Sequence, residues 1–169
     1  MDGEQTDPGL TRPPGDLDLV ALARELNRLG VAYVVVGGMA INRLGFVRAT
    51  NDIDLLIARD LANQALVKKA LEILPEKAIR ELGDEDIALW VVVRVNDEIT
   101  VDLMTETCRV TYEEARSGIE VEIIEGVPVP FAGADLMLKL KQGVRSKDVE
   151  DRGFLEQLLR SRRPDGSKG

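Results

Sequence analysis

Two aspartates at alternate positions, Asp52 and Asp54, open a short apolar run that continues to Ile57. If this run is a β-strand, both carboxylates lie on one face, because strand side chains repeat with a period of two. Ile53 and Leu55 then lie on the opposite, apolar face. Two carboxylates side by side repel each other unless a cation lies between them. Magnesium is the expected cation, since it binds one or two protein carboxylates and keeps coordination sites for water and substrate phosphates.

A pair of glycines, Gly37 and Gly38, ends an earlier apolar run at positions 31–36 and precedes a short amphipathic segment. The pattern predicts a strand, a Gly-Gly turn and a helix. Glycine lets the backbone approach a ligand closely, and the first N–H groups of the helix point at any phosphate placed there. A turn that holds phosphates and a strand that holds metal ions together predict a nucleotide-phosphate site.

The spacing of the two motifs resembles a known signature. Gly37-Gly38, thirteen further residues and Asp52-x-Asp54 resemble the signature of the nucleotidyltransferase superfamily, which has the DNA polymerase β-like fold. The surrounding residues, Gly-Gly-x-Ala and Arg-x-Thr-x-Asp-Ile-Asp-Leu-Leu-Ile, most closely resemble its small prokaryotic members. These are the AbiEii-like and minimal nucleotidyltransferase groups, which are often met in toxin–antitoxin pairs.

A third carboxylate, Asp102, stands inside a later apolar segment, with Val101 and Leu103 on the opposite strand face. A carboxylate there is costly unless it is paired or metal-bound. In the superfamily a third acidic residue arrives on such a strand, so the resemblance implies that Asp102 shares a metal and acts as general base. The other interpretation is an exposed aspartate on a one-sided antiparallel sheet.

Two polar residues just before the acidic pair, Arg48 and Thr50, are candidates for contacts with the nucleotide phosphates. For Arg48 a second interpretation stays open, that of a structural partner of the acidic pair.

The C-terminal part contains Lys139 and then Lys147-Asp148-x-x-Asp151, which resembles the C-terminal motif of the AbiEii-like group. The resemblance implies that Lys139 reaches the triphosphate, that Lys147 also contributes to nucleotide binding, and that Asp151 orients a substrate group or acts as a second base. Asp148 and Asp151 are three residues apart and hence neighbours on a helix face. The alternative is a capped, salt-bridged helix start.

Hydrophobic periodicity and turn residues divide the chain into alternating helices and strands. Together they predict an α/β (α+β) fold: a small mixed β-sheet, with helices packed mainly on one face, and a short C-terminal helical segment. Helices are expected at 16–29, after Gly38, at 60–74, 112–115, 132–141 and 146–160. Strands are expected at 31–36, 52–57, 87–95, 99–104, 119–124 and 127–130, with a charged connection containing a short extended piece at 76–86 and a hairpin turn at 96–98.

One domain accommodates all of these elements. Its expected parts are a disordered N-terminal tail (1–14), a nucleotidyltransferase-like core (15–131), C-terminal helices of the same domain (132–161) and a flexible tail (162–169).

The composition limits the chemistry. The 169 residues are 44% hydrophobic, 31% charged and 4% aromatic, with one cysteine, Cys108, and no histidine. An internal disulfide, a cysteine-based zinc site and Ser-His-Asp or Cys-His catalysis are therefore excluded, which leaves carboxylate–metal chemistry. No apolar run is as long as a membrane span, and residues 1–14 lack a signal pattern, so we expect a cytoplasmic protein with no membrane partner.

The net charge of −8 argues against broad, non-specific binding to nucleic acid, which depends on neutralising phosphates. A nucleic-acid substrate could still bind a local basic patch. The residues near the C-terminus that could form one, with a solvated tail as the alternative, are Arg160, Arg162, Arg163 and Lys168.

The sequence thus predicts a Mg²⁺-dependent nucleotidyltransferase that transfers an NMP from an NTP to a hydroxyl, with two Mg²⁺ ions at the three aspartates. Three acceptors stay open: a tRNA end, a protein side chain, or a small antibiotic such as an aminoglycoside. A cognate toxin or antitoxin is a further expected partner. The alternative is a catalytically weak or inactive protein of the same fold that acts as an antitoxin-like binding module.

Overall fold

The computed structural model describes residues 11–83, 86–89 and 91–163. Its main sheet is built from the strands β1 (Tyr33–Val36), β2 (Asp52–Ile57), β3 (Val92–Asn96), β4 (Thr100–Met104), β7 (Ile119–Ile124) and β8 (Val127–Ala132). Their order across the sheet is β3-β4-β2-β1-β8-β7, and β5 (Glu106–Thr107) pairs with β6 (Val110–Thr111) in a separate small sheet.

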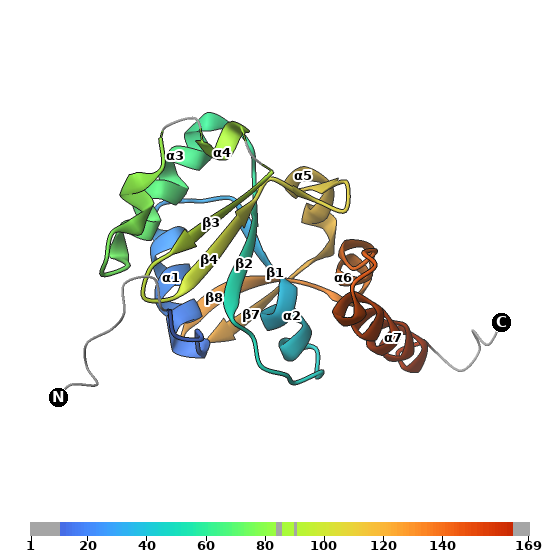
Figure 1. The fold of residues 1–169 in the computed structure, drawn as a ribbon. Coiled ribbons are helices and arrows are strands. Elements are labelled where there is room, and N and C mark those ends of the chain that lie inside the picture. The colour runs from blue at the N-terminus through green and yellow to red at the C-terminus, as the bar shows by residue number, and fades with distance from the viewer. Residues whose placement is uncertain (1–10, 84–85, 90, 164–169) are drawn as a thin grey trace.

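The helices surround this sheet (Figure 1). They are α1 (Asp16–Arg28), α2 (Gly37–Arg43), α3 (Leu61–Ala70), α4 (Asp86–Leu89), α5 (Tyr112–Ala115), α6 (Ala134–Leu140) and α7 (Ser146–Ser161). Short 3₁₀ segments lie at Leu71–Ile73, Ala78–Glu81 and Arg116–Gly118.

The main sheet is mixed, as the sequence predicts. Strand β1 pairs antiparallel with β2 and parallel with β8, whereas β2 pairs parallel with β4. In Figure 1, α1 and α3 lie to one side of β2, and α5, α6 and α7 lie to the other. All four residues of β1 are buried, which explains why its sequence is a continuous apolar run rather than an alternating one.

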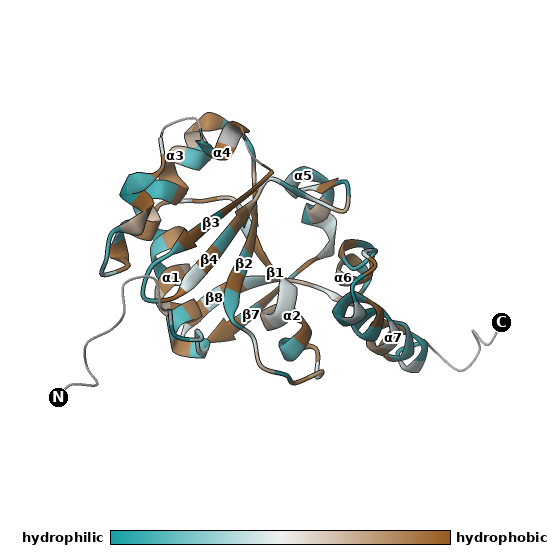
Figure 2. Cartoon of the chain, in the orientation of Figure 1, coloured by the Kyte–Doolittle hydropathy of each residue, from teal (hydrophilic) through white to brown (hydrophobic). Residues whose placement is uncertain are grey.

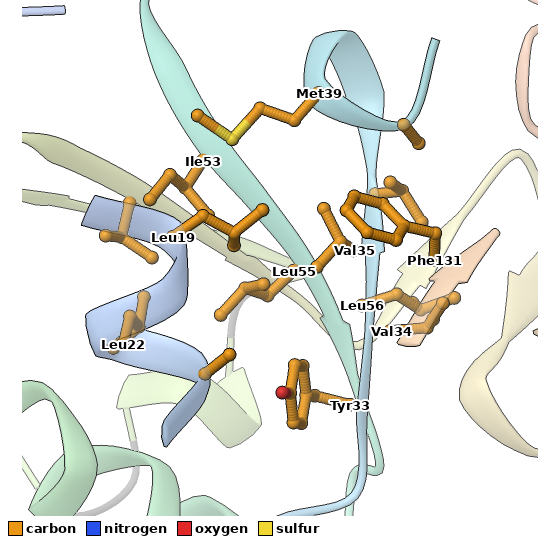
Figure 3. Packing of buried hydrophobic residues seen from close by; sticks show 14 of the residues in the cluster. Leu19, Leu22, Tyr33, Val34, Val35, Met39, Ile53, Leu55, Leu56 and Phe131 are labelled. Atoms are coloured by element: carbon orange, nitrogen blue, oxygen red, sulfur yellow. The ribbon is translucent and has the colours of Figure 1, made fainter. Parts of the chain in front are cut away.

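The hydrophobic core decides which way the catalytic candidates point. Figure 3 shows Leu19 and Leu22 of α1 beside Ile53 and Leu55 of β2, with Tyr33 of β1 close by; all five are buried. Because strand side chains alternate, burial of this face of β2 directs its aspartates to the opposite face. Figure 2 shows hydrophobic residues along the strands of the sheet, whereas α7 is largely hydrophilic.

The strand predicted over 87–95 is wrong in its first part. Asp86–Leu89 form the helical turn α4, and the strand begins only at Val92. The carboxylate of Asp86 accepts a hydrogen bond from the N–H of Gly83 at 2.6 Å, and Ile87 is buried. This local bond closes a turn and thereby overrides the strand propensity of the apolar residues that follow. Trp90, placed in that strand by the prediction, lies outside the described residues.

The connection predicted over 76–86 contains no described extended piece but a 3₁₀ segment at Ala78–Glu81. Its position depends on Asp97, a buried residue of the predicted hairpin turn. The carboxylate of Asp97 accepts hydrogen bonds from the backbone N–H groups of Glu76 and Ala78, each at 2.9 Å. A long-range side-chain contact therefore shapes this segment.

Both predicted tails fall partly outside the described residues, which begin at position 11 and end at 163. Within them, Arg12 donates hydrogen bonds from its guanidinium to Asp18 and Glu98, whereas Arg162 and Arg163 are exposed. Lys168 lies beyond the described part. Among the described residues, no helix has both the length and the apolar character needed to cross a membrane.

Candidate active site

Three carboxylates meet where β2 and β4 run side by side. The parallel register pairs Asp54 directly with Asp102 and places Asp52 opposite Thr100. Carboxylate oxygens of Asp52, Asp54 and Asp102 all lie within 4.8 Å of one another, and the side chains are half-buried or buried. This spacing suits a shared divalent cation, because oxygen ligands at such a site surround the ion from several directions. We call these three residues the acidic triad.

The acidic triad is electrostatically strained when no cation is bound. Burial, together with the neighbouring carboxylates of Asp52 and Asp102, raises the pKa of Asp54 to about 8. Burial also raises the pKa of Asp52, again helped by the charge of Asp102. The carboxylates of the acidic triad therefore retain a proton between them near neutral pH.

One cation of the protein already contacts the acidic triad. Arg94 of β3 lies opposite Asp102 in the antiparallel pairing of β3 with β4. Its guanidinium donates from Nε to Oδ1 of Asp102 at 2.8 Å and from Nη2 to Oδ2 at 2.9 Å. The same Nη2 reaches Asp52 at 3.3 Å. These bonds raise the pKa of Arg94 above its ordinary value.

The Gly-Gly turn packs directly against the acidic triad. Gly37 has a φ of +70°, and a Cβ atom there would lie 1.9 Å from Oδ2 of Asp54. A Cβ atom on Gly38 would lie 2.8 Å from Oγ1 of Thr50. Glycine is thus required at Gly37 by backbone conformation and by space at once. The turn and the carboxylates form one compact unit.

A cavity of about 460 Å³ opens over this unit. It is lined from the Gly-Gly turn, the loop before β2, the strands β2, β3 and β4, the β5–β6 hairpin, and the helices α6 and α7. The charged residues of the lining are Arg48, Asp52, Asp54, Arg94, Asp102, Lys141, Arg145, Lys147 and Asp148.

Thr50 lies in the same lining, and its hydroxyl donates to the backbone carbonyl of Asp52 at 3.1 Å. This bond fixes the loop just before β2. Lys147 is exposed and also lines the cavity.

Arg48 turns away from the acidic pair toward α7. Its Nη2 atom lies 2.7 Å from Oδ2 of Asp151, a fully buried carboxylate. Lys141, which directly follows α6, contacts the same oxygen at 2.9 Å. Asp151 is therefore held between two cations that belong to different elements, and it is absent from the residues that line the cavity. Beside this contact, Phe46 and Phe154 stack with ring centroids 5.1 Å apart.

Lys139, the lysine that the sequence placed near the triphosphate, does not reach this cavity. It is exposed and lines a separate cavity of about 230 Å³ near β7. Lys141 lines the cavity over the acidic triad instead. Lys139 lies in the last turn of α6, whereas Lys141 is its C-cap residue with a non-helical backbone (φ −109°, ψ 36°), so the two side chains take different directions.

Arg94, Lys141 and Arg145 are cavity residues that the sequence interpretation did not single out. For Arg94 the register of the hairpin decides: the observed turn at 97–99 places it opposite Asp102, an opposite-charge cross-strand pair, whereas the turn predicted at 96–98 would have placed it opposite Thr100. For Lys141 and Arg145, which flank the ends of α6 and α7, no local signal in the sequence distinguishes them from other cations near helix ends.

Several solved structures have a similar fold. The chain aligns with the lincosamide antibiotic adenylyltransferase LnuA in its lincomycin-bound structure over 87% of its own length and 99% of that chain, with a TM-score of 0.57 and 13% identity. It aligns with ANT(2″)-Ia in complex with adenylyl-2″-tobramycin over 83% of its own length and 87% of that chain, with a TM-score of 0.55 and 14% identity. For a proposed nucleotidyltransferase from Thermotoga maritima the alignment covers 85% of this chain and 91% of that one, with a TM-score of 0.52 and 15% identity.

At these identities the likeness defines the fold, which is a nucleotidyltransferase-like α/β fold. No protein-family model and no curated protein sequence matches the chain.

Proposed function

We propose that the protein is a metal-dependent nucleotidyltransferase that transfers an NMP from an NTP to a hydroxyl acceptor. The observation that supports this best is the meeting of Asp52, Asp54 and Asp102 against the Gly37-Gly38 turn. Neither motif alone distinguishes an active site from a turn. The two in contact, beneath a cavity, combine a cation site with a place for phosphates.

The residues fit a divalent metal ion. The carboxylates are close together, partly buried and mutually repulsive, and a guanidinium already neutralises part of their charge. Two Mg²⁺ ions at Asp52, Asp54 and Asp102 are the proposed cofactors. When bound, they would supply charge neutralisation at the phosphoryl oxygens and a lowered pKa of the acceptor hydroxyl.

The phosphates of the NTP would lie between the Gly37-Gly38 turn and the cations on the α6–α7 side of the cavity, Lys141, Arg145 and Lys147. Lys147 is the most available of these, because Lys141 and Arg145 also pair with Asp148. Thr50 borders the turn and is a further candidate for phosphate contact. Arg48 would act indirectly, through its bond to Asp151, by fixing the loop that carries Thr50.

In the proposed reaction the acceptor hydroxyl oxygen attacks the α-phosphorus of the NTP. The bond from that phosphorus to the pyrophosphate oxygen breaks, and pyrophosphate leaves with the electron pair. Asp102 accepts the hydroxyl proton as general base. Asp54 and Asp52 orient the reacting groups, and their half-buried position keeps bulk water from competing as the acceptor.

The charge of the cavity limits which classes of acceptor fit it. Five cationic side chains line it, and its fourth carboxylate, Asp148, is buried and bound to Arg145 and Lys141. A polycationic acceptor such as an aminoglycoside would find no unpaired carboxylate outside the acidic triad. A neutral small molecule, a protein hydroxyl or an RNA end fits this charge better, and we propose the acceptor from among these.

A partner-protein function remains the second candidate, with the chain as the nucleotidyltransferase-fold member of an AbiEii-like or minimal nucleotidyltransferase toxin–antitoxin pair. The features that favour it are the acidic net charge of −8 and the small size of the chain. The same cavity would then serve recognition rather than transfer.

Titration calorimetry with each of the four NTPs, with and without Mg²⁺, tests the proposal on wild type and on Asp52→Asn. We expect Mg²⁺-dependent binding of at least one NTP that the variant loses. Glu113→Gln, which removes an exposed carboxylate paired with Arg116, is the matched control and should bind as wild type does. If no NTP binds, the enzyme proposal fails and the partner function becomes the one to pursue.

A further inference from the structure

We propose that Arg94 is a built-in counter-cation of the metal-free acidic triad, and that a divalent ion displaces its guanidinium from Asp102 on binding. Arg94 would therefore set the metal affinity of the site as a positioning residue. The inference rests on the metal site of the proposed function and on no other part of it.

The contacts of Arg94 are those of a substitute for a metal ion. Its guanidinium binds both oxygens of Asp102 and reaches Asp52 with the same Nη2 atom. Two of the three proposed metal ligands are therefore engaged by one protein cation. A bidentate arginine–carboxylate pair uses both carboxylate oxygens, so Asp102 cannot direct an oxygen freely to a metal ion while the pair is intact.

Arg94 is also free to leave. Its side chain is 57% exposed, and β3 is an edge strand of the sheet. No hydrogen bond of the guanidinium to any group other than Asp102 and Asp52 is found in the described part of the chain. The side chain can therefore swing into solvent without breaking core packing.

Three of the four other cations of the cavity pair with carboxylates of α7, and the fourth, Lys147, is exposed. Arg145 is bound by Asp148, Lys141 by Asp148 and Asp151, and Arg48 by Asp151. In the described structure Arg94 is the cation that shares its partners with the proposed metal ions. Arg94 thereby stabilises the metal-free protein by offsetting repulsion within the acidic triad. When a metal ion binds, like-charge repulsion between the ion and Arg94 favours release of the guanidinium.

The experiment measures binding of Mn²⁺ alone, as a probe of the divalent site, by electron paramagnetic resonance on wild type, Arg94→Gln, Arg94→Lys and Arg145→Gln. Arg145→Gln is the matched control: it removes the same charge from the same cavity, but Arg145 pairs with Asp148 rather than with the acidic triad. We expect Mn²⁺ to bind about tenfold more tightly to Arg94→Gln and to change much less in Arg145→Gln. Arg94→Lys keeps the charge but cannot form the bidentate pair with Asp102, so its Mn²⁺ affinity should lie between those of wild type and Arg94→Gln.

A spectroscopic signal reports the displacement directly. The side-chain Nε–H resonance of Arg94, assigned by its loss in Arg94→Gln, should move when Mg²⁺ is added to wild type. It should not move in Asp52→Asn, in which the metal site is damaged.

Thermal unfolding separates this role from a merely structural one. A structural bond would stabilise the metal-free and Mg²⁺-bound proteins equally. We expect the metal-free Arg94→Gln variant to have a lower Tm than metal-free wild type. At saturating Mg²⁺ the two proteins should have the same Tm. An unchanged Arg94 resonance with Mg²⁺, or equal affinity changes in Arg94→Gln and Arg145→Gln, would overturn the proposal. If displacement occurs but no NTP is used, the proposed transfer fails while the inference about Arg94 stands.

Discussion

Two groups of aspartates lie at or beside the same cavity, and they differ in how their charges are neutralised. Asp148 and Asp151 of α7 are buried, and each is contacted by two cations from Arg48, Lys141 and Arg145. In the described structure one cation, Arg94, contacts the acidic triad, at Asp52 and Asp102. Burial acts to raise the pKa of Asp148, but the bonds from Arg145 and Lys141 outweigh it and lower that pKa, whereas the pKa of Asp54 is raised to about 8.

This difference in charge neutralisation assigns a structural role to one group and a binding role to the other. The α6–α7 group, defined as Lys141, Arg145, Asp148 and Asp151, has its carboxylate charges paired within the chain and joins α6 to α7. The acidic triad is left short of positive charge, which is unfavourable for folding and favourable for binding a cation. Four substitutions or conditions test whether the two groups really differ in this way.

The largest expected effect is on catalysis by Asp54→Asn. Transfer of NMP should fall by about 10³-fold, because the amide carries no charge for a metal ion. The Tm should not fall, since the amide resembles the protonated carboxyl that the metal-free site already favours. Pyrophosphate release and thermal unfolding measure the two effects. Full activity in this variant would show that the metal assignment is wrong.

Gly37→Ala should also impair catalysis, by about 10²-fold, because its Cβ atom would push Asp54 out of position. Gly30→Ala is the control: Gly30 has a similar φ of +74°, but nothing lies within 4 Å of its added Cβ. Both variants carry a backbone cost of about 1 kcal/mol, so their stability by chemical unfolding should fall alike, apart from crowding at Gly37. Equal activity in the two would mean that the turn and the acidic triad are not one unit.

Asp151→Asn should leave no large direct effect on chemistry but should destabilise the fold by about 3 kcal/mol. The change leaves the partly buried Arg48 and Lys141 without their shared carboxylate. Urea unfolding measures the loss. Glu113→Gln breaks only an exposed pair and should barely change stability. A stable Asp151→Asn with greatly reduced activity would instead support the catalytic role that the sequence motif implied.

The smallest effect expected is on the pH dependence of stability. The pKa of Asp54 is about 8 in the folded protein, against 3.8 for an unperturbed aspartate. A raised carboxyl pKa means that its contribution is fully present below the unfolded pKa and is lost as the pH rises through the folded pKa. The free energy of unfolding of the metal-free protein should therefore fall between roughly pH 4 and 8 and level off above that range. Asp54→Asn should flatten this dependence, and saturating Mg²⁺ should reverse it; an unchanged slope in Asp54→Asn would assign it to another group.

Much of the fold could be predicted from local patterns. The period-two and helical spacings located β1, β2 and β4 and the helices α1, α6 and α7 close to their observed bounds. The failures at 76–95 have one cause: the side chains of Asp86 and Asp97 bind backbone N–H groups and bend the chain. Composition and periodicity carry no information on such bonds.

The sequence by itself determined the elements and the chemical types at the site, because the alternation in β2 and the glycines before α2 are local properties of the chain. Only the tertiary structure decided which of the distant residues contact one another. The parallel register of β2 with β4 brings Asp102 to Asp54, and the direction of α6 selects Lys141 over Lys139. The tertiary structure also pairs Arg48 with Asp151, which is 103 residues away in the sequence. Contacts between distant segments depend on how the sheet and helices pack, and a local pattern cannot specify that packing.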